Sequence, residues 1–255
     1  MDGEPDPAQR YVAPDDEKTL QRWTTLGTGE GMKMASNERT YLPAAGHDWL
    51  LPFYDPVVKL MGGESAHRQL IDQAHLQAGQ RILEIGCGTG NLTILVKALY
   101  PAVEVVGLDP DPRALERARR KADRQQVSVQ LDRGFSDRLP YAEESFDRVL
   151  SALMFHHLER DEKKQTLYEV RRVLRAGGSL HVLDFGGAHD RSDGFLAQLL
   201  HRSEHARDNS RDTILTLMRE AGFADPGEVT HRRTIFGRIF YFHASQPRRL
   251  APGAV

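Results

Sequence analysis

Short apolar runs alternate with segments of helical spacing between residues 81 and 185. Apolar runs bounded by turn residues are typical of buried strands, whereas apolar positions that recur at helical spacing are typical of amphipathic helices. The pattern predicts a helix at 161–174 that is closed by Gly177 and Gly178. The other expected elements of this part are strands at 81–86, 103–109, 127–132, 146–154 and 179–185, and helices at 91–99 and 110–123.

The alternation continues to the end of the chain, with a helix at 211–222 and two β-rich segments at 228–233 and 237–245. Strands that alternate with helices of this length imply right-handed crossovers and a mostly parallel sheet that is covered on both faces. The two last segments are close enough to pair as an antiparallel hairpin. The sequence therefore predicts a doubly wound, Rossmann-like α/β fold with a mostly parallel seven-stranded sheet and a C-terminal antiparallel hairpin.

The first part of the chain differs in pattern from the rest. Residues 1 to 40 show little apolar periodicity, and residues 41–63 mix aromatic residues, proline and histidine in a way that suits short helices packed onto a larger body. We expect residues 1–63 to form an arm and a helical lid, residues 64–246 the main domain, and residues 247–255 a tail.

Composition and charge narrow the possible partners. The 255 residues carry a formal net charge of −2, which gives no strong field for attracting a nucleic acid. Cys87 is the single cysteine, so intrachain disulfides and cysteine-based zinc sites are excluded. The acidic, proline-containing start and the lack of a long apolar run lead us to expect a cytoplasmic protein without a membrane span.

A glycine-rich turn follows the first expected strand. Gly86, Gly88 and Gly90 allow the backbone to bend sharply and to pass close to a ligand. A dinucleotide fingerprint would require glycine at position 91, where this chain has Asn91, which argues against an NAD-dependent oxidoreductase without excluding it. A glycine-rich turn without any ligand is the simplest alternative.

Asp109 ends the second expected strand, nineteen residues after Gly90. A carboxylate at this position can accept hydrogen bonds from both ribose hydroxyls of an adenosine ligand. The alternative is that Asp109, which precedes Pro110, only caps the next helix.

Five ordered motifs between Arg81 and Phe185 resemble one family. They read EIGCGTGN, GLDP, LPYAEESFDRV, HHL and RRVLRAGGSL. The chain resembles the class I S-adenosylmethionine-dependent methyltransferases, in particular the branch of the ubiquinone and menaquinone biosynthesis C-methyltransferases. The resemblance implies S-adenosylmethionine as cofactor and methyl transfer as activity.

The same resemblance implies roles for individual residues. Asp109 is expected to bind the ribose, and Phe135 stands where many relatives have an aspartate that meets the adenine amino group, so the backbone of Phe135 and Ser136 is expected to serve there, with Asp137 reaching in. The methionine end and the adenine are expected to lie against Glu84, Gly86, Gly88, Thr89, Gly90, Asn91, Pro110 and Ala152.

The residues that act on the methyl acceptor are less defined. His156 and His157 follow the fourth expected strand at its carboxyl end, and a neutral imidazole is a suitable base near neutral pH. Tyr54, with His47 and Asp55, lies in the expected lid. Each of these residues also has a purely structural interpretation, and a non-catalytic module that only binds S-adenosylmethionine remains an alternative. The aromatic and apolar lid favours a small aromatic or lipid-like acceptor.

One motif points to a different class of protein. His201, Glu204 and His205 form an H-x-x-E-H pattern, as in inverted zinc proteases. The surrounding segment, 195–208, equally fits an amphipathic helix with a polar face, and no third ligand is evident. We therefore expect no metal. Cys87 is expected to be structural, because a nucleophilic thiol beside a sulfonium would methylate itself.

Overall fold

A computed structural model describes residues 63–186, 209–234 and 237–248 of the chain. Nearly all of the expected arm and lid, with Tyr54, His47 and Asp55, lies outside the described residues, as does the H-x-x-E-H segment. Within the described part, no helix has the length and the apolar character needed to cross a membrane.

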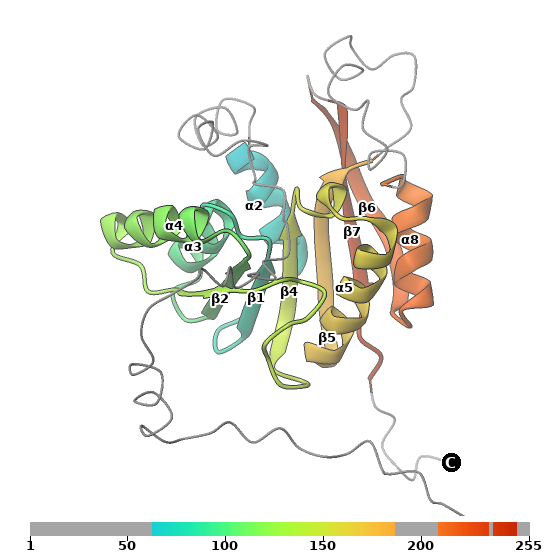
Figure 1. The fold of residues 1–255 in the computed structure, drawn as a ribbon, viewed down its shortest axis with the longest axis horizontal. Coiled ribbons are helices and arrows are strands. Elements are labelled where there is room, and N and C mark those ends of the chain that lie inside the picture. Colours follow the sequence, from blue (N-terminus) through green and yellow to red (C-terminus); the bar gives the residue numbers. More distant parts are fainter. Residues whose placement is uncertain (1–62, 187–208, 235–236, 249–255) are drawn as a thin grey trace, which may run out of the picture. The chain divides into compact units, whose positions relative to one another are not determined.

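A seven-stranded sheet forms the centre of the described chain, with the strand order β3-β2-β1-β4-β5-β7-β6. All neighbouring strands run parallel except β7, which pairs antiparallel with both β5 and β6. This confirms the predicted mostly parallel sheet and its C-terminal hairpin (Figure 1). The strands are β1 (Arg81–Ile85), β2 (Glu104–Asp109), β3 (Gln130–Arg133), β4 (Phe146–Ala152), β5 (Leu174–Phe185), β6 (Ala224–Thr234) and β7 (Gly237–Ser245).

Helices cover both faces of the sheet, and each face has its own hydrophobic core. Along β1, Leu83 packs with residues of α5 and α8, whereas Ile82 packs with residues of α2 and α3. A strand buried on both faces in this way reads as a nearly continuous apolar run, which is why the pattern identified it. The helices are α2 (Gly63–Ala74), α3 (Asn91–Leu99), α4 (Pro112–Gln125), α5 (Arg160–Val173) and α8 (Arg211–Glu220), with a short 3₁₀ turn η3 (Phe155–His157).

Some predicted boundaries were wrong. The helix expected at 161–174 ends at Val173, and Gly177 and Gly178 do not close it but lie in β5. Leu174 has the extended backbone and pairs with Phe146, so the chain passes from helix to strand without a separate turn.

Two further boundaries shift because helix α4 is capped at both ends. It begins at Pro112, not at 110, since the Asp111 side chain accepts a hydrogen bond of 2.8 Å from the Arg113 N–H. At the end of this helix, the Val127 N–H donates a hydrogen bond of 3.1 Å to the Ala122 carbonyl. Strand β3 therefore starts only at Gln130 and not at 127. Helix α2 was not predicted as an element.

Candidate functional site

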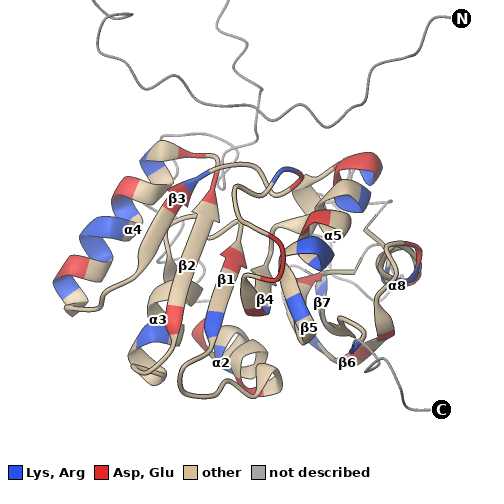
Figure 2. Cartoon of the chain, turned by 90° about the horizontal axis from the view of Figure 1, so that it is seen from below, with Lys and Arg blue, Asp and Glu red and all other residues tan. Residues whose placement is uncertain are grey.

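The carboxyl ends of the parallel strands β1, β2, β4 and β5 lie at one edge of the sheet. Ligands of doubly wound folds bind at this edge, in the crevice beyond the strand ends. Figure 2 shows that β1 and β2 both end in acidic segments there. The residues that follow these strands therefore define the candidate site.

The loop after β1 has glycine at three alternate positions, which serve two different purposes. Gly86, Gly88 and Gly90 all have positive φ values, of 70°, 52° and 78°. A Cβ on Gly86 would lie 2.3 Å from Cγ of Met154, and one on Gly90 would lie 2.8 Å from Cβ of Ala118. A Cβ on Gly88 would meet no atom within 4 Å. Two glycines therefore permit close packing, and Gly88 faces open space.

Asp109 fastens this loop to the end of β2. Its Oδ2 accepts a hydrogen bond of 2.7 Å from the Gly88 N–H, and its Oδ1 accepts one of 2.9 Å from the Asp111 N–H. The residue is 8% exposed, and burial raises its pKa to about 6, although both N–H groups act in the opposite direction. Each carboxylate oxygen retains a lone pair that can accept a further hydrogen bond.

Glu84 adds a second buried carboxyl group beneath the loop. It accepts a hydrogen bond from the Thr93 hydroxyl and is 3% exposed. Burial raises the pKa of Glu84 to about 8, and the nearby charge of Asp109 adds to this rise. The hydrogen bonds from Thr93 lower the pKa but do not outweigh burial. A ligand that carries positive charge would favour the ionised forms of both carboxyl groups, whereas a diphosphate would disfavour them.

Lys121 of α4 holds the outer side of the loop and was missed by the sequence analysis. Its ammonium group donates hydrogen bonds of 2.9 Å to Oγ1 of Thr89 and 2.8 Å to Oδ1 of Asn91. The available signal was helical spacing, because Lys121 lies one turn beyond Ala118, the residue that packs against Gly90. The expectation that Thr89 and Asn91 line the ligand side of this turn stays a prediction.

The loop after β3 lies beside Asp109. The Gly134 N–H donates to the Asp109 carbonyl at 3.2 Å, which brings the backbone of Phe135 and Ser136 to this strand end. The Ser136 hydroxyl itself is 2.9 Å from that of Thr166 in α5. The contact with Thr166 involves the Ser136 hydroxyl and not its backbone, which is the part expected to meet the adenine. The adenine roles of Pro110, Phe135 and Ser136 stay predictions.

His156, in the η3 turn after β4, pairs with a residue that the sequence analysis missed. Its Nδ1 lies 2.8 Å from Oδ1 of Asp184, which is fully buried in β5. Asp184 also accepts hydrogen bonds from the Phe185 N–H at 2.7 Å and from the Asn209 side-chain amide at 3.2 Å. The available signal for Asp184 was its position near the carboxyl end of the fifth expected strand.

The charge state of Asp184 follows from these contacts. Burial opposes ionisation, but His156 and the Phe185 N–H outweigh it and hold the pKa of Asp184 below its ordinary value. The ring of His157 lies 4.0 Å from that of His156, centroid to centroid. Both predicted histidines thus lie together, whereas Tyr54 lies outside the described residues.

Cys87, within the glycine loop, is buried against the sheet. Burial holds the pKa of its thiol well above the ordinary value, so the thiol stays neutral. A Cβ on Gly107 in β2 would lie only 3.0 Å from its Sγ. These contacts support the structural role that was expected for Cys87.

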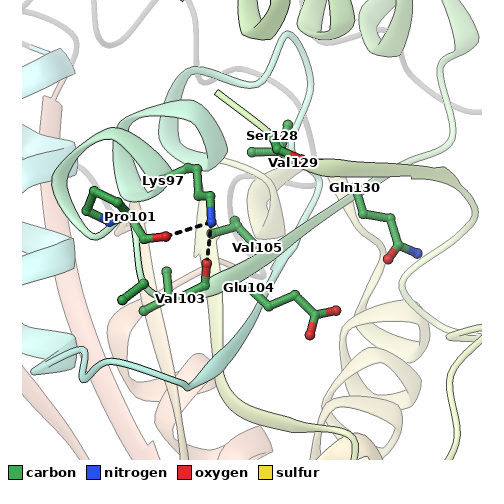
Figure 3. Close-up of a pocket in the computed structure, with 9 residues that line it drawn as sticks. Lys97, Pro101, Val103, Glu104, Val105, Ser128, Val129 and Gln130 are labelled. Atoms are coloured by element: carbon green, nitrogen blue, oxygen red, sulfur yellow. Dashed lines mark hydrogen bonds between the residues drawn. The ribbon is translucent and has the colours of Figure 1, made fainter. Parts of the chain in front are cut away.

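A shallow groove at the opposite edge of the sheet offers no comparable chemistry. It has a volume of about 460 Å³ and is lined by the start of β2 and the segment before β3 (Figure 3). Lys97 lines the groove, and its ammonium group already donates hydrogen bonds to the carbonyls of Pro101 at 2.9 Å and Val103 at 2.7 Å. Among the described residues, no group of three or more histidine, cysteine or acidic side chains could hold a metal ion.

Comparison with known proteins identifies the domain. Residues 82–178 match a family described as a methyltransferase domain. A demethylmenaquinone methyltransferase of Deinococcus radiodurans is 36% identical over 139 residues, which make up 53% of this chain and 57% of that protein. One of Thermus thermophilus is 37% identical over 139 residues, or 53% of this chain and 62% of the relative. The match therefore spans less than two thirds of either relative.

A solved structure supports the fold. The phosphoethanolamine N-methyltransferase 2 of Haemonchus contortus, in complex with S-adenosyl-L-methionine, superimposes with a TM-score of 0.68. The alignment covers 80% of this chain and 58% of that one, at 15% sequence identity.

The residues at the strand ends fit the cofactor of such domains. Open space lies over Gly88, Asp109 presents carboxylate oxygens beside it, and the buried carboxyl groups of Glu84 and Asp109 suit a ligand with a sulfonium and an ammonium group. Residues 82–178 thus match a methyltransferase domain, and the similarity to the two curated relatives supports the class I S-adenosylmethionine-dependent methyltransferases as its family.

Proposed function

We propose that this protein transfers the methyl group of S-adenosylmethionine to a small-molecule acceptor. The observation that carries the proposal is the link between Gly88 and Asp109. A glycine that faces open space is held by the same carboxylate that we propose accepts hydrogen bonds from the ribose hydroxyls. A turn that served only to connect β1 with α3 would not need a buried carboxylate beneath open space.

The bound cofactor would supply an electrophilic methyl group, and the chain would supply position. Asp109 would bind the ribose, and the backbone of Phe135 and Ser136, with Pro110, would flank the adenine. The methionine end would lie between the glycine loop, Glu84 and Ala152. Holding the methyl group in line with the acceptor can lower the barrier by ~7–11 kcal/mol, so alignment and exclusion of water dominate the catalysis.

The acceptor is proposed to be aromatic or lipid-like. Two relatives are named demethylmenaquinone methyltransferases, so reduced demethylmenaquinone is the first compound to test. The net charge of −2 supports a small molecule over a nucleic acid, and the single cysteine is compatible with the proposed cytoplasmic location. A non-catalytic module would bind the cofactor but methylate no acceptor, and an NAD-dependent oxidoreductase would bind a different nucleotide.

Replacing Asp109 with asparagine is expected to weaken binding of S-adenosylmethionine by roughly 10- to 150-fold, which corresponds to the ~1.5–3 kcal/mol of charge-assisted hydrogen bonds. Titration calorimetry measures the affinity, and circular dichroism checks that the variant is folded. Asp123→Asn, on the exposed side of α4, is the matched control and should bind like the wild type. An unchanged affinity for the Asp109 variant would contradict the ribose assignment.

A further inference from the structure

We propose that His156 and Asp184 form a general-base pair, in which His156 takes a proton from a hydroxyl group of the methyl acceptor and Asp184 positions the imidazole and stabilises the imidazolium that forms. The inference rests on the proposed function and goes beyond it, because it names the class of acceptor. A phenol, enol or other hydroxyl compound must lose a proton during methylation, whereas a thiolate need not.

The hydrogen bond between the two residues fixes the tautomer of the imidazole. Asp184 is ionised and can only accept, so Nδ1 of His156 must carry the proton in their 2.8 Å contact. In the neutral imidazole, the lone pair that can accept a proton is therefore on Nε2, on the other side of the ring. The His156 side chain is 22% exposed while Asp184 is fully buried, so the basic nitrogen belongs to the partner that solvent and ligands can reach.

The pair lies next to the loop that would hold the methyl donor. Met154, two residues before His156, packs so closely on Gly86 that a Cβ there would come within 2.8 Å of its Cβ. Asp184 follows Leu183, whose carbonyl accepts a hydrogen bond of 2.7 Å from the Leu153 N–H. The ends of β4 and β5 thus bring the base to the same strand edge as the glycine loop.

The hydrogen bonds around Asp184 stabilise its ionised carboxylate and hold its side chain in one position. The Asn209 amide and the Phe185 N–H both donate to its Oδ1, together with His156. Asp184 and His157 are titratable groups that contact the His156 ring. A second histidine–carboxylate pair, His231 with Glu228, has the same 2.8 Å distance, but its histidine is 52% exposed and its carboxylate 16%. Burial of the carboxylate distinguishes the pair at the strand ends.

The proposed step balances in atoms and charge. The acceptor O–H proton moves to Nε2 of His156, and the electron pair left on the acceptor forms the bond to the methyl carbon, at oxygen or at a conjugated ring carbon. The S–CH₃ bond breaks with its electrons staying on sulfur, which becomes neutral. The resulting imidazolium is stabilised by the Asp184 carboxylate until the proton passes to water.

Turnover with labelled S-adenosylmethionine tests the pair, with reduced demethylmenaquinone, a catechol and a small thiol as acceptors. His156→Ala and Asp184→Asn are expected to lower kcat for the hydroxyl acceptors by roughly 10²–10⁴-fold, the usual contribution of a positioned base. KM and the affinity for S-adenosylmethionine should stay near the wild-type values. Added imidazole should partly restore the His156→Ala variant, whereas Asp184→Asn, which keeps the imidazole, should not respond to it.

The controls separate this proposal from the proposed function. His75→Gln, in the exposed turn after α2 at the far edge of the sheet, should leave kcat unchanged. Variants that keep wild-type kcat, or a wild-type protein that methylates only the thiol, would overturn the base pair while leaving methyl transfer intact. If Asp184→Asn fails to fold, His156→Ala with imidazole rescue still decides. A wild-type protein that binds the cofactor but methylates none of the acceptors would refute catalysis and the base pair together.

Discussion

Gly88→Ala is expected to abolish measurable binding of S-adenosylmethionine while the protein remains folded. The added methyl group meets no protein atom, so it would stand in the open space where the cofactor is proposed to lie. The backbone cost of an alanine with positive φ is about 1–2 kcal/mol, which a domain of this size can tolerate. Calorimetric titration and thermal unfolding measure the two effects separately.

Two other glycines provide the controls. Gly79 has a similar backbone, with φ of 80°, and a Cβ there also meets no atom within 4 Å, but it lies before β1 at the opposite strand edge. Gly79→Ala should therefore lose similar stability and bind the cofactor normally. Gly86→Ala should lose far more stability, because its Cβ would overlap the Met154 side chain. Normal binding by Gly88→Ala would show that the cofactor does not use this loop.

Glu84→Gln is expected to stabilise the cofactor-free protein by roughly 3 kcal/mol at pH 7 and to weaken cofactor binding. Folding raises the pKa of Glu84 from 4.5 to about 8. The favourable contribution of its protonated form is therefore complete below pH 4.5 and is lost as the pH rises through about 8. Glutamine resembles the protonated form at every pH and can still accept the hydrogen bond from Thr93.

Urea unfolding at acidic and at alkaline pH tests this prediction. The wild type should lose stability over the interval between the two pKa values of Glu84, and the variant should lose much less. The remaining loss belongs to Asp109, whose pKa is raised to about 6. Glu104→Gln, an exposed carboxylate at the start of β2, is the control and should change stability by less than about 0.5 kcal/mol. A Glu84 variant less stable than the wild type would contradict the assignment of a protonated buried carboxyl group.

The sequence predicts the central sheet well because its strands are buried on both faces. Two strong local signals identify β1 and the loop after it. The strand is a continuous apolar segment, and the glycines that follow tolerate positive φ. Asp109 follows from the same logic, since the end of the neighbouring strand must lie at the same edge. Local signals of this kind need no knowledge of distant residues.

Contacts between distant residues are what the sequence does not reveal. Asp184 lies 28 positions after His156, and Asn209 lies 25 positions after Asp184, so their meeting depends on the order of the strands and on α8. Lys121 reaches Asn91 across 30 positions because α4 packs against the glycine loop. The wrongly predicted end of α5 also has a distant cause, because Leu174 joins the sheet by pairing with Phe146 of β4.

The most direct test of the cofactor assignment is a calorimetric titration of the wild-type protein with S-adenosylmethionine and, separately, with NAD. The geometry of Gly88, Asp109 and Glu84 predicts saturable heat at one site for S-adenosylmethionine and none for NAD. Saturable binding of NAD together with no heat and no thermal stabilisation from S-adenosylmethionine would contradict it.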